Sequence, residues 1–170
     1  LCVDNLKAGD SRAVFKNTGY DLLSYNNLRM FLHLDNKAGS SSIDGKVSAF
    51  LRIGTDLSEN YYEIEKLGLI ASTPNQDPTP EQVWFDQNSI DIPFNELRNV
   101  KIKRDGNPLN KLNQKFSMPF ENASGKYIIT VVGRPDISSV QTMMMGIRNP
   151  STTNEDLSFC VWMNEMRVNG

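Results

Sequence analysis

The apolar positions are densest in the last thirteen residues, Ser158–Gly170 (SFCVWMNEMRVNG), where their pattern predicts an extended strand. Residues two apart along a strand share a face. One face carries Phe159, Val161 and Met163, and the other carries Cys160, Trp162, Asn164, Met166 and Val168. Because the first half of the segment is apolar on both faces, we expect a central strand that is covered on both sides.

Polar residues follow where this strand should leave the core. Asn164, Glu165 and Arg167 come directly after the apolar run that contains Trp162. We expect these four residues to form a structural junction that fixes the end of the strand before the chain continues.

Two earlier segments alternate in the same way. Leu28–Leu34 places Leu, Met, Leu and Leu on one face, and Val47–Ile53 places Val, Ala, Leu and Ile on one face. The segment between them, Asp35–Lys46, is rich in Gly and Ser and suits an exposed hairpin loop. The two strands are therefore predicted to be antiparallel neighbours.

The rest of the chain also favours strands, because turn residues separate short apolar runs throughout. Further strands are expected within Asn60–Ala71, Val83–Phe85, Ile90–Ile92, Lys126–Gly133 and Thr142–Ile147. Prolines break the pattern over Ser72–Pro80, and the polar stretch Arg104–Met118 resembles a loop. One short helix is predicted at Pro93–Lys101, because Pro is suited to the first turn of a helix.

Strands at this spacing indicate an all-β domain. We expect a two-sheet antiparallel β-sandwich of the jelly-roll (galactose-binding-like) type with one short helix, and a single domain over residues 1–170. The 170 residues, 39% of them hydrophobic, are enough to bury one core. The first residues carry no leader pattern, so we expect a piece excised from a longer chain.

The charge balance excludes some partners. The net charge is −2 with both signs interspersed, which gives no field for nucleic acid. No run approaches the roughly 18 apolar residues of a membrane helix. We expect contact with a membrane only through the rest of a parent chain.

The two cysteines, Cys2 and Cys160, lie near opposite ends of the chain. If the first and last strands are neighbours, the two sulfur atoms can form a disulfide in an oxidising compartment. The alternative is a pair of buried free thiols that behave as small apolar side chains.

Catalytic and metal chemistry find little support in the sequence. The single histidine, His33, lies in an apolar strand, where a half-buried structural role is expected. Glu63 and Glu65 share a strand face at a spacing that some glycosidases use, but a polar outer face of the strand, which would also carry Tyr62 and Lys66, explains them equally well. The acidic loop residues Asp35, Asp44, Asp56 and Glu59 are a weak candidate for a calcium site, because they match no EF-hand spacing. We expect no enzyme activity, no metal and no cofactor.

Three other groups of residues carry weaker signals. The aromatic residues Tyr61, Tyr62 and Trp84, with Tyr25 and Phe85 near other strands, suggest a possible surface for stacking sugars, although core packing explains most of them. Lys101, Lys103 and Arg104 suggest a solvated strand edge. The run Met143–Met145 should place its members on opposite faces, chiefly in core packing, with a partner surface as the alternative.

Several segments in order resemble one family, the SprA/Sov giant outer-membrane proteins of Bacteroidetes type IX secretion and gliding motility. They are LLSYNNLRMFLH (22–33), FLRIGTDLSENYYEIE (50–65), VW (83–84) with NSIDI (88–92), ITVVGRPD (129–136), MMMGIRNP (143–150) and VWMNEMRV (161–168). That family usually closes with an element more like Val-Trp-Val-Asn-Glu-Leu-Arg. Here Met163 and Met166 replace the aliphatic residues, which is a conservative change.

The resemblance implies a non-enzymatic, structural or partner-docking domain of a protein-secretion translocon. It implies a location at the outer membrane of a Gram-negative bacterium, facing the periplasm or the cell surface. The implied partners are other secretion-machinery subunits or exported proteins. The alternative function is a carbohydrate-binding module of a cell-envelope protein, and a glycosidase comes third.

Overall fold

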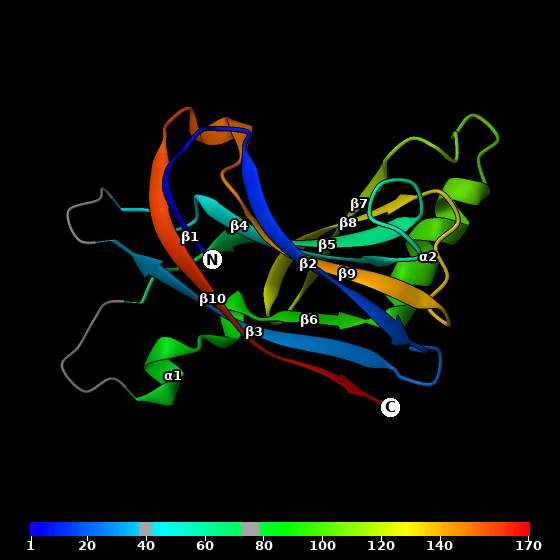
Figure 1. Cartoon of the computed structure of the whole chain (residues 1–170), viewed down its shortest axis with the longest axis horizontal. Helices are drawn as coiled ribbons and strands as arrows, with labels where there is room; N and C mark the ends of the chain where they lie inside the picture. The colour runs from blue at the N-terminus through cyan, green and yellow to red at the C-terminus, as the bar shows by residue number, and fades with distance from the viewer. Residues whose placement is uncertain (38–41, 73–78) are drawn as a thin grey trace.

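The computed structural model describes residues 1–37, 42–72 and 79–170, and it arranges their strands as two antiparallel sheets (Figure 1). In order across the smaller sheet, the strands are β1 (Cys2–Leu6), β10 (Leu157–Asn169), β3 (Asn27–Asn36) and β6 (Ile90–Pro93). In order across the larger sheet, they are β2 (Ser11–Tyr20), β9 (Val140–Arg148), β4 (Val47–Gly54), β5 (Tyr61–Leu69), β8 (Gly125–Val132) and β7 (Phe116–Asn122). The predicted all-β, two-sheet sandwich is confirmed, whereas its jelly-roll connectivity stays a prediction.

The core lies between the sheets and follows the alternation of the sequence. In β3, every second residue from Leu28 to Leu34 is fully buried, and the residues between them are half-buried on the outer face. The inward residues of β4 start at Val47 and end at Ile53. Met143 of β9 is also buried in this core, with Met145 packed against it, so the prediction that the methionines pack into the core is confirmed for these two.

One helix of three turns packs at the end of the larger sheet that carries β7 and β8 (Figure 1). This helix, α2 (Phe94–Asp105), begins directly after Pro93 as predicted and buries Phe94, Leu97 and Val100. It continues past the predicted end, so Lys101, Lys103 and Arg104 lie on a helix and not on a strand edge.

Three short helical segments, α1 (Pro80–Val83), η1 (Asp86–Asn88) and η2 (Ser151–Thr153), complete the described elements. The predicted strand at Val83–Phe85 is therefore wrong, because these residues fall at the end of α1 and before η1. Most of the predicted break at Ser72–Pro80 falls outside the described residues. None of the helices in the described parts of the chain is long and apolar enough to span a bilayer.

The predicted pairing of the strands on either side of Asp35–Lys46 is also wrong. β3 pairs with β10 and β6 in the smaller sheet, whereas β4 pairs with β5 and β9 in the larger sheet. The connection therefore crosses from one sheet to the other. Strands that are consecutive in the sequence of a sandwich often pack face to face across the core, and the alternation alone does not separate the two arrangements.

Candidate functional site

The outer face of the smaller sheet carries most of the residues predicted to be functional. Cross-strand register pairs Trp162 of β10 with His33 of β3, and Asn164 with Phe31. Trp162 exposes 60% of its surface, although it lies in the middle of a strand. The expectation that β10 is covered on both sides is therefore wrong, because its outer face is open to solvent.

An arginine-aromatic row continues this face beyond Trp162. The guanidinium carbon of Arg29 lies 4.7 Å from the centroid of the Phe31 ring, and that of Arg167 lies 5.8 Å from it. Arg29 also donates a 2.7 Å hydrogen bond to Asp86 of η1. Two cations therefore lie beside one ring, an arrangement worth about 0.5–1 kcal/mol for each exposed contact.

A β-bulge interrupts β10 where the polar cluster begins. Asn164 pairs with Phe31 and Arg167 pairs with Arg29, so Glu165 and Met166 together oppose a single residue of β3. Glu165 adopts a left-handed backbone (φ 46°) and forms an ion pair with Arg167. The sequence predicted a polar junction here but gave no sign of a bulge, because Glu is uncommon at positive φ.

The bulge changes which side chains face the core. After the extra residue, Met166 and Val168 pack against the core with Met163, and Arg167 faces outward. The prediction that Met166 and Val168 share a face with Trp162 is therefore wrong. All four residues of the predicted junction are exposed: Trp162, Asn164, Glu165 and Arg167. Only the Glu165–Arg167 ion pair and the contact of Arg167 with Phe31 could hold the strand end. The structural role of the group stays a prediction.

The cysteine pair lies on the same outer face, beside this group. Cys2 of β1 is the cross-strand partner of Cys160 of β10, and the structure joins their sulfur atoms in a disulfide. The next pair along the ladder, Leu1 and Val161, exchanges two backbone hydrogen bonds of 2.8 Å. The structure thus has the neighbouring first and last strands that the disulfide hypothesis requires, and the oxidation state in solution stays a prediction.

The proposed sugar-stacking residues do not form one surface. Tyr61 and Tyr62 are neighbours on β5 and face opposite sides of the larger sheet, and each exposes only 3% of its surface. Trp84 instead lies on the other sheet, with its ring centroid 5.8 Å from that of His33. His33 is half-buried, and its Nδ1 lies 2.9 Å from the Val83 carbonyl oxygen. Of the three stacking candidates, only Trp84 lies near the Trp162 face.

The outer face of the larger sheet holds the two glutamates that resembled a catalytic pair. Arg52 and Arg148 both bind Glu63, at 2.6 Å and 3.2 Å, and Arg148 also binds Glu65. Because guanidinium groups occupy both carboxylates, neither is open to a substrate. The side chain of Arg148 in turn lies 4.7 Å from the ring centroid of Phe50, which is buried although it points outward.

A buried lysine was missed by sequence reasoning, which placed it on a polar outer face with the glutamates. Lys66 shares the inward face of β5 with Tyr62 and exposes 2% of its surface. Its ammonium group donates to the Ser124 carbonyl and lies 4.7 Å from the Tyr127 ring centroid, with no carboxylate partner among the described residues. Burial lowers the pKa of Lys66 to about 8.

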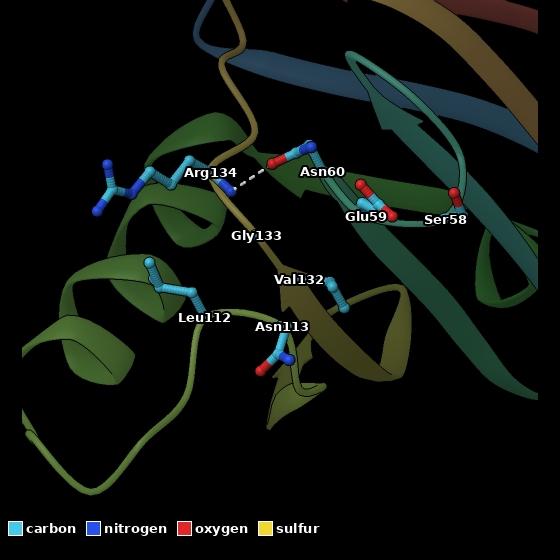
Figure 2. A pocket seen from close by; sticks show the side chains of 8 residues that line it. All are labelled: Ser58, Glu59, Asn60, Leu112, Asn113, Val132, Gly133 and Arg134. Carbon is cyan, nitrogen blue, oxygen red and sulfur yellow. Dashed lines mark hydrogen bonds between the residues drawn. The ribbon is translucent and has the colours of Figure 1, made fainter.

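A hollow of about 500 Å³ lies where the β4–β5 loop meets the end of β8 (Figure 2). Backbone packing sets its shape: a methyl group at Gly133 would overlap the Glu59 carbonyl, and the Arg134 amide donates to the Asn60 side chain at 2.9 Å. Figure 2 shows the Arg134 side chain pointing away from the other labelled side chains, so the hollow offers little convergent charge.

Acidic residues near this hollow do not gather into a metal site. Burial alone would raise the pKa of Asp56. Its carboxylate, however, accepts hydrogen bonds from the Asn60 side chain and from the backbone amides of Ser58, Glu59 and Asn60, and together these lower the pKa well below its usual range. The Asp56 carboxylate therefore caps its own loop. Within residues 1–37, 42–72 and 79–170, no group of three or more His, Cys, Asp or Glu side chains is placed to hold a metal ion.

The fold and the outer face of the smaller sheet define the class of the protein as an all-β sandwich domain with an exposed aromatic and cationic surface. The chain matches the SprA_N family model, described as motility related/secretion protein, over residues 1–170, and it belongs to that family. The membership confirms the resemblance to SprA. No curated protein matches the chain.

Proposed function

We propose that this chain is a non-enzymatic partner-docking domain of an outer-membrane translocon that serves type IX protein export and gliding motility. Membership of a motility and secretion family over the whole chain supports the setting. In this proposal the domain faces the periplasm or the cell surface, and it contacts other secretion-machinery subunits or exported proteins.

The observation that carries the docking role is the exposed Trp162 in the middle of a sheet face, beside the Phe31 ring and its two arginines. Trp and Arg are the residues most enriched among those that dominate binding energy at protein interfaces. The strand supplies a rigid base for these side chains, so little backbone conformational entropy is lost when a partner binds.

Site-specific photo-crosslinking in cells tests this role. A photoreactive residue in place of Trp162, introduced into the full parent protein, should crosslink to a secretion subunit or an exported protein. A photoreactive residue at Leu109, which is also exposed but lies in the loop after α2, is the matched control. Equal crosslinking at both positions, or none at position 162 in actively secreting cells, overturns the role of this face.

Carbohydrate binding remains the second candidate, because the same face holds both Trp162 and Trp84. An exposed indole offers a flat apolar surface for a sugar ring. Addition of envelope glycans to the purified chain should then change tryptophan fluorescence, and Trp162→Ala should abolish the change. Unchanged fluorescence across a glycan panel removes this candidate and leaves protein docking.

A further inference from the structure

Basic residues gather at one end of the molecule, although the chain as a whole is nearly neutral. Residues 97–115, which cover most of α2 and the loop before β7, include six basic residues and one acidic residue, Asp105. This stretch has a net charge of +5, and the rest of the chain has −7. Asp105 pairs with the buried Arg104. The exposed cations of the stretch form no ion pair with a described residue: Arg98, Lys103, Lys111 and Lys115.

Three aliphatic side chains are exposed among these cations. Ile102 exposes 67% of its surface, Leu109 85% and Leu112 38%. Ile102 lies on the outward face of α2, one turn after Arg98 and next to Lys103, because the buried residues of the helix occupy the opposite face. Leu109 and Leu112 lie in the loop that follows. Basic and apolar side chains are thus interleaved along the last turn of α2 and this loop.

Hydrogen bonds hold the loop in place while its apolar side chains stay exposed. The Leu109 amide donates to the Asn107 side chain at 3.0 Å. The Leu112 carbonyl accepts a 2.7 Å hydrogen bond from the Gly133 amide, which ties the loop to the end of β8. Figure 1 shows the loop projecting beyond the sheets, at the upper right. The loop therefore presents Leu109 to solvent on a backbone that is already ordered.

The exposure of this surface does not come from an interrupted strand. The last residues of the chain lie at the other end of α2, because Asn26 bonds to both Asn169 and Phe94 through its backbone. At about 1.5 Å per residue, the twelve residues of α2 place the loop about 18 Å from that point. Leu1 lies in the smaller sheet, bonded to Val161. The loop itself joins two described elements, α2 and β7, and its apolar side chains are exposed with both in place.

The chemistry of this surface favours a lipid partner over a protein. Protein interfaces are enriched in aromatic residues and arginine and depleted in lysine. Residues 97–115 contain four lysines and no aromatic residue. Exposed aliphatic side chains flanked by lysines are instead typical of segments that lie on anionic membranes, where the lysines approach the headgroups. The Trp162 face has the opposite character, so the two surfaces suit different partners.

We propose that the last turn of α2 and the loop after it bind the surface of an anionic phospholipid membrane. Ile102 and Leu109 enter the boundary between headgroups and acyl chains, and the exposed lysines contact the lipid phosphates. The inference goes beyond the proposed docking function, because it uses a different surface and a different class of partner. It also departs from the expectation that only the rest of a parent chain contacts a membrane, because that expectation rested on the net charge and on the lack of a long apolar run.

Co-sedimentation of the purified chain with lipid vesicles tests the proposal. Vesicles of equal parts phosphatidylglycerol and phosphatidylcholine should bind the chain, and vesicles of phosphatidylcholine alone should not. Binding to the anionic vesicles should weaken as the salt concentration rises, because salt screens the attraction between exposed charges. A chain that stays in the supernatant with anionic vesicles at low salt overturns the proposal.

A charge reversal tests the basic part of the surface. Lys111→Glu/Lys115→Glu should weaken binding to the anionic vesicles by more than about tenfold, since two cations near the headgroups become anions. Arg12→Glu/Lys16→Glu makes the same change in net charge on exposed residues of β2 and should keep wild-type binding. An equal loss in both variants would show a response to net charge alone and would overturn the assignment of this surface.

A second pair of variants tests the apolar part. Leu109→Ser should weaken binding to the anionic vesicles by about tenfold, because the apolar side chain no longer enters the membrane. Phe15→Ser is the matched control, since Phe15 exposes 68% of its surface but lies on the larger sheet. Unchanged binding of Leu109→Ser would show adsorption by charge without insertion, and the proposal would then be wrong.

A peptide of alternating Glu and Leu is the probe for an acidic protein partner. If the chain binds this peptide in fluorescence anisotropy but does not sediment with anionic vesicles, the surface binds protein and the lipid assignment is wrong. Crosslinking at position 162 reports on the proposed docking function alone. Either inference can therefore fail without the other.

Discussion

Lys66 provides a test of the packing between the sheets, because its ammonium group is buried and has no anionic partner among the described residues. Lys66→Met keeps a long, flexible side chain and removes the charge. Burial lowers the pKa of Lys66 from 10.5 to about 8, so between pH 8 and 10.5 the unfolded chain binds more protons than the folded chain. Stability therefore rises with pH across this window and is constant with respect to this group below it.

The size of the effect follows from the two pKa values. Each pKa unit corresponds to about 1.4 kcal/mol, so the protonated amine lowers the free energy of unfolding by about 3 kcal/mol at pH 7. At pH 9.5 the penalty falls to about 1 kcal/mol. Wild-type protein should therefore gain about 2 kcal/mol between these pH values relative to Lys66→Met.

The substitution also leaves the Ser124 carbonyl without its donor, which costs about 1–3 kcal/mol at either pH. The absolute stability of the variant is consequently a weaker test than the difference between the two pH values. Measurements should stay below pH 10, because burial raises the pKa of Tyr62 and of Tyr127 to about 12, and these groups make stability fall between pH 10 and 12.

Urea unfolding followed by tryptophan fluorescence at pH 7 and pH 9.5 supplies the measurement. Lys126→Met, an exposed lysine on the neighbouring strand, is the control and should keep the wild-type pH dependence. The same pH dependence in Lys66→Met as in wild type would instead show that the Lys66 amine titrates normally in the folded chain.

Three further substitutions test other parts of the structure. Gly146→Ala should lower the unfolding free energy by about 1–3 kcal/mol, because a methyl group would overlap the Phe50 ring and, less severely, the Ala13 Cβ atom. In a Phe50→Ala background the loss should shrink but not vanish, since the Ala13 contact remains; an undiminished loss contradicts the overlap with Phe50. The double variant Cys2→Ser/Cys160→Ser should lower the free energy of unfolding by about 2–5 kcal/mol in urea experiments. A reductant should destabilise the wild-type protein but not this variant. Arg167→Ala should lower the free energy of unfolding by less than about 1 kcal/mol, because the Glu165–Arg167 ion pair is exposed. A larger loss of stability in melting experiments would show that Arg167 holds the strand more strongly than its contacts explain.

Alternation predicted the strands that have one buried face, and it failed where no such face exists. β2 is exposed along nearly its whole length, so SRAVFKNTGY carries no apolar period and was missed. β7 contains Pro119, which weakens a strand prediction even though an edge strand tolerates it. The inward direction of Lys66 was missed because a lysine is ordinarily assigned to a solvent-exposed face.

The site was harder to predict than the fold, because its geometry depends on contacts between distant segments. The sequence predicted that the strand leaves the core at the polar cluster after Trp162, but β10 continues to Asn169 and the cluster lies at a bulge that reverses the faces. Nothing local in the sequence shows that Phe31 meets Arg167, since β3 and β10 pair only in the folded chain. The exposure of Trp162 likewise depends on the absence of a covering layer among the described residues.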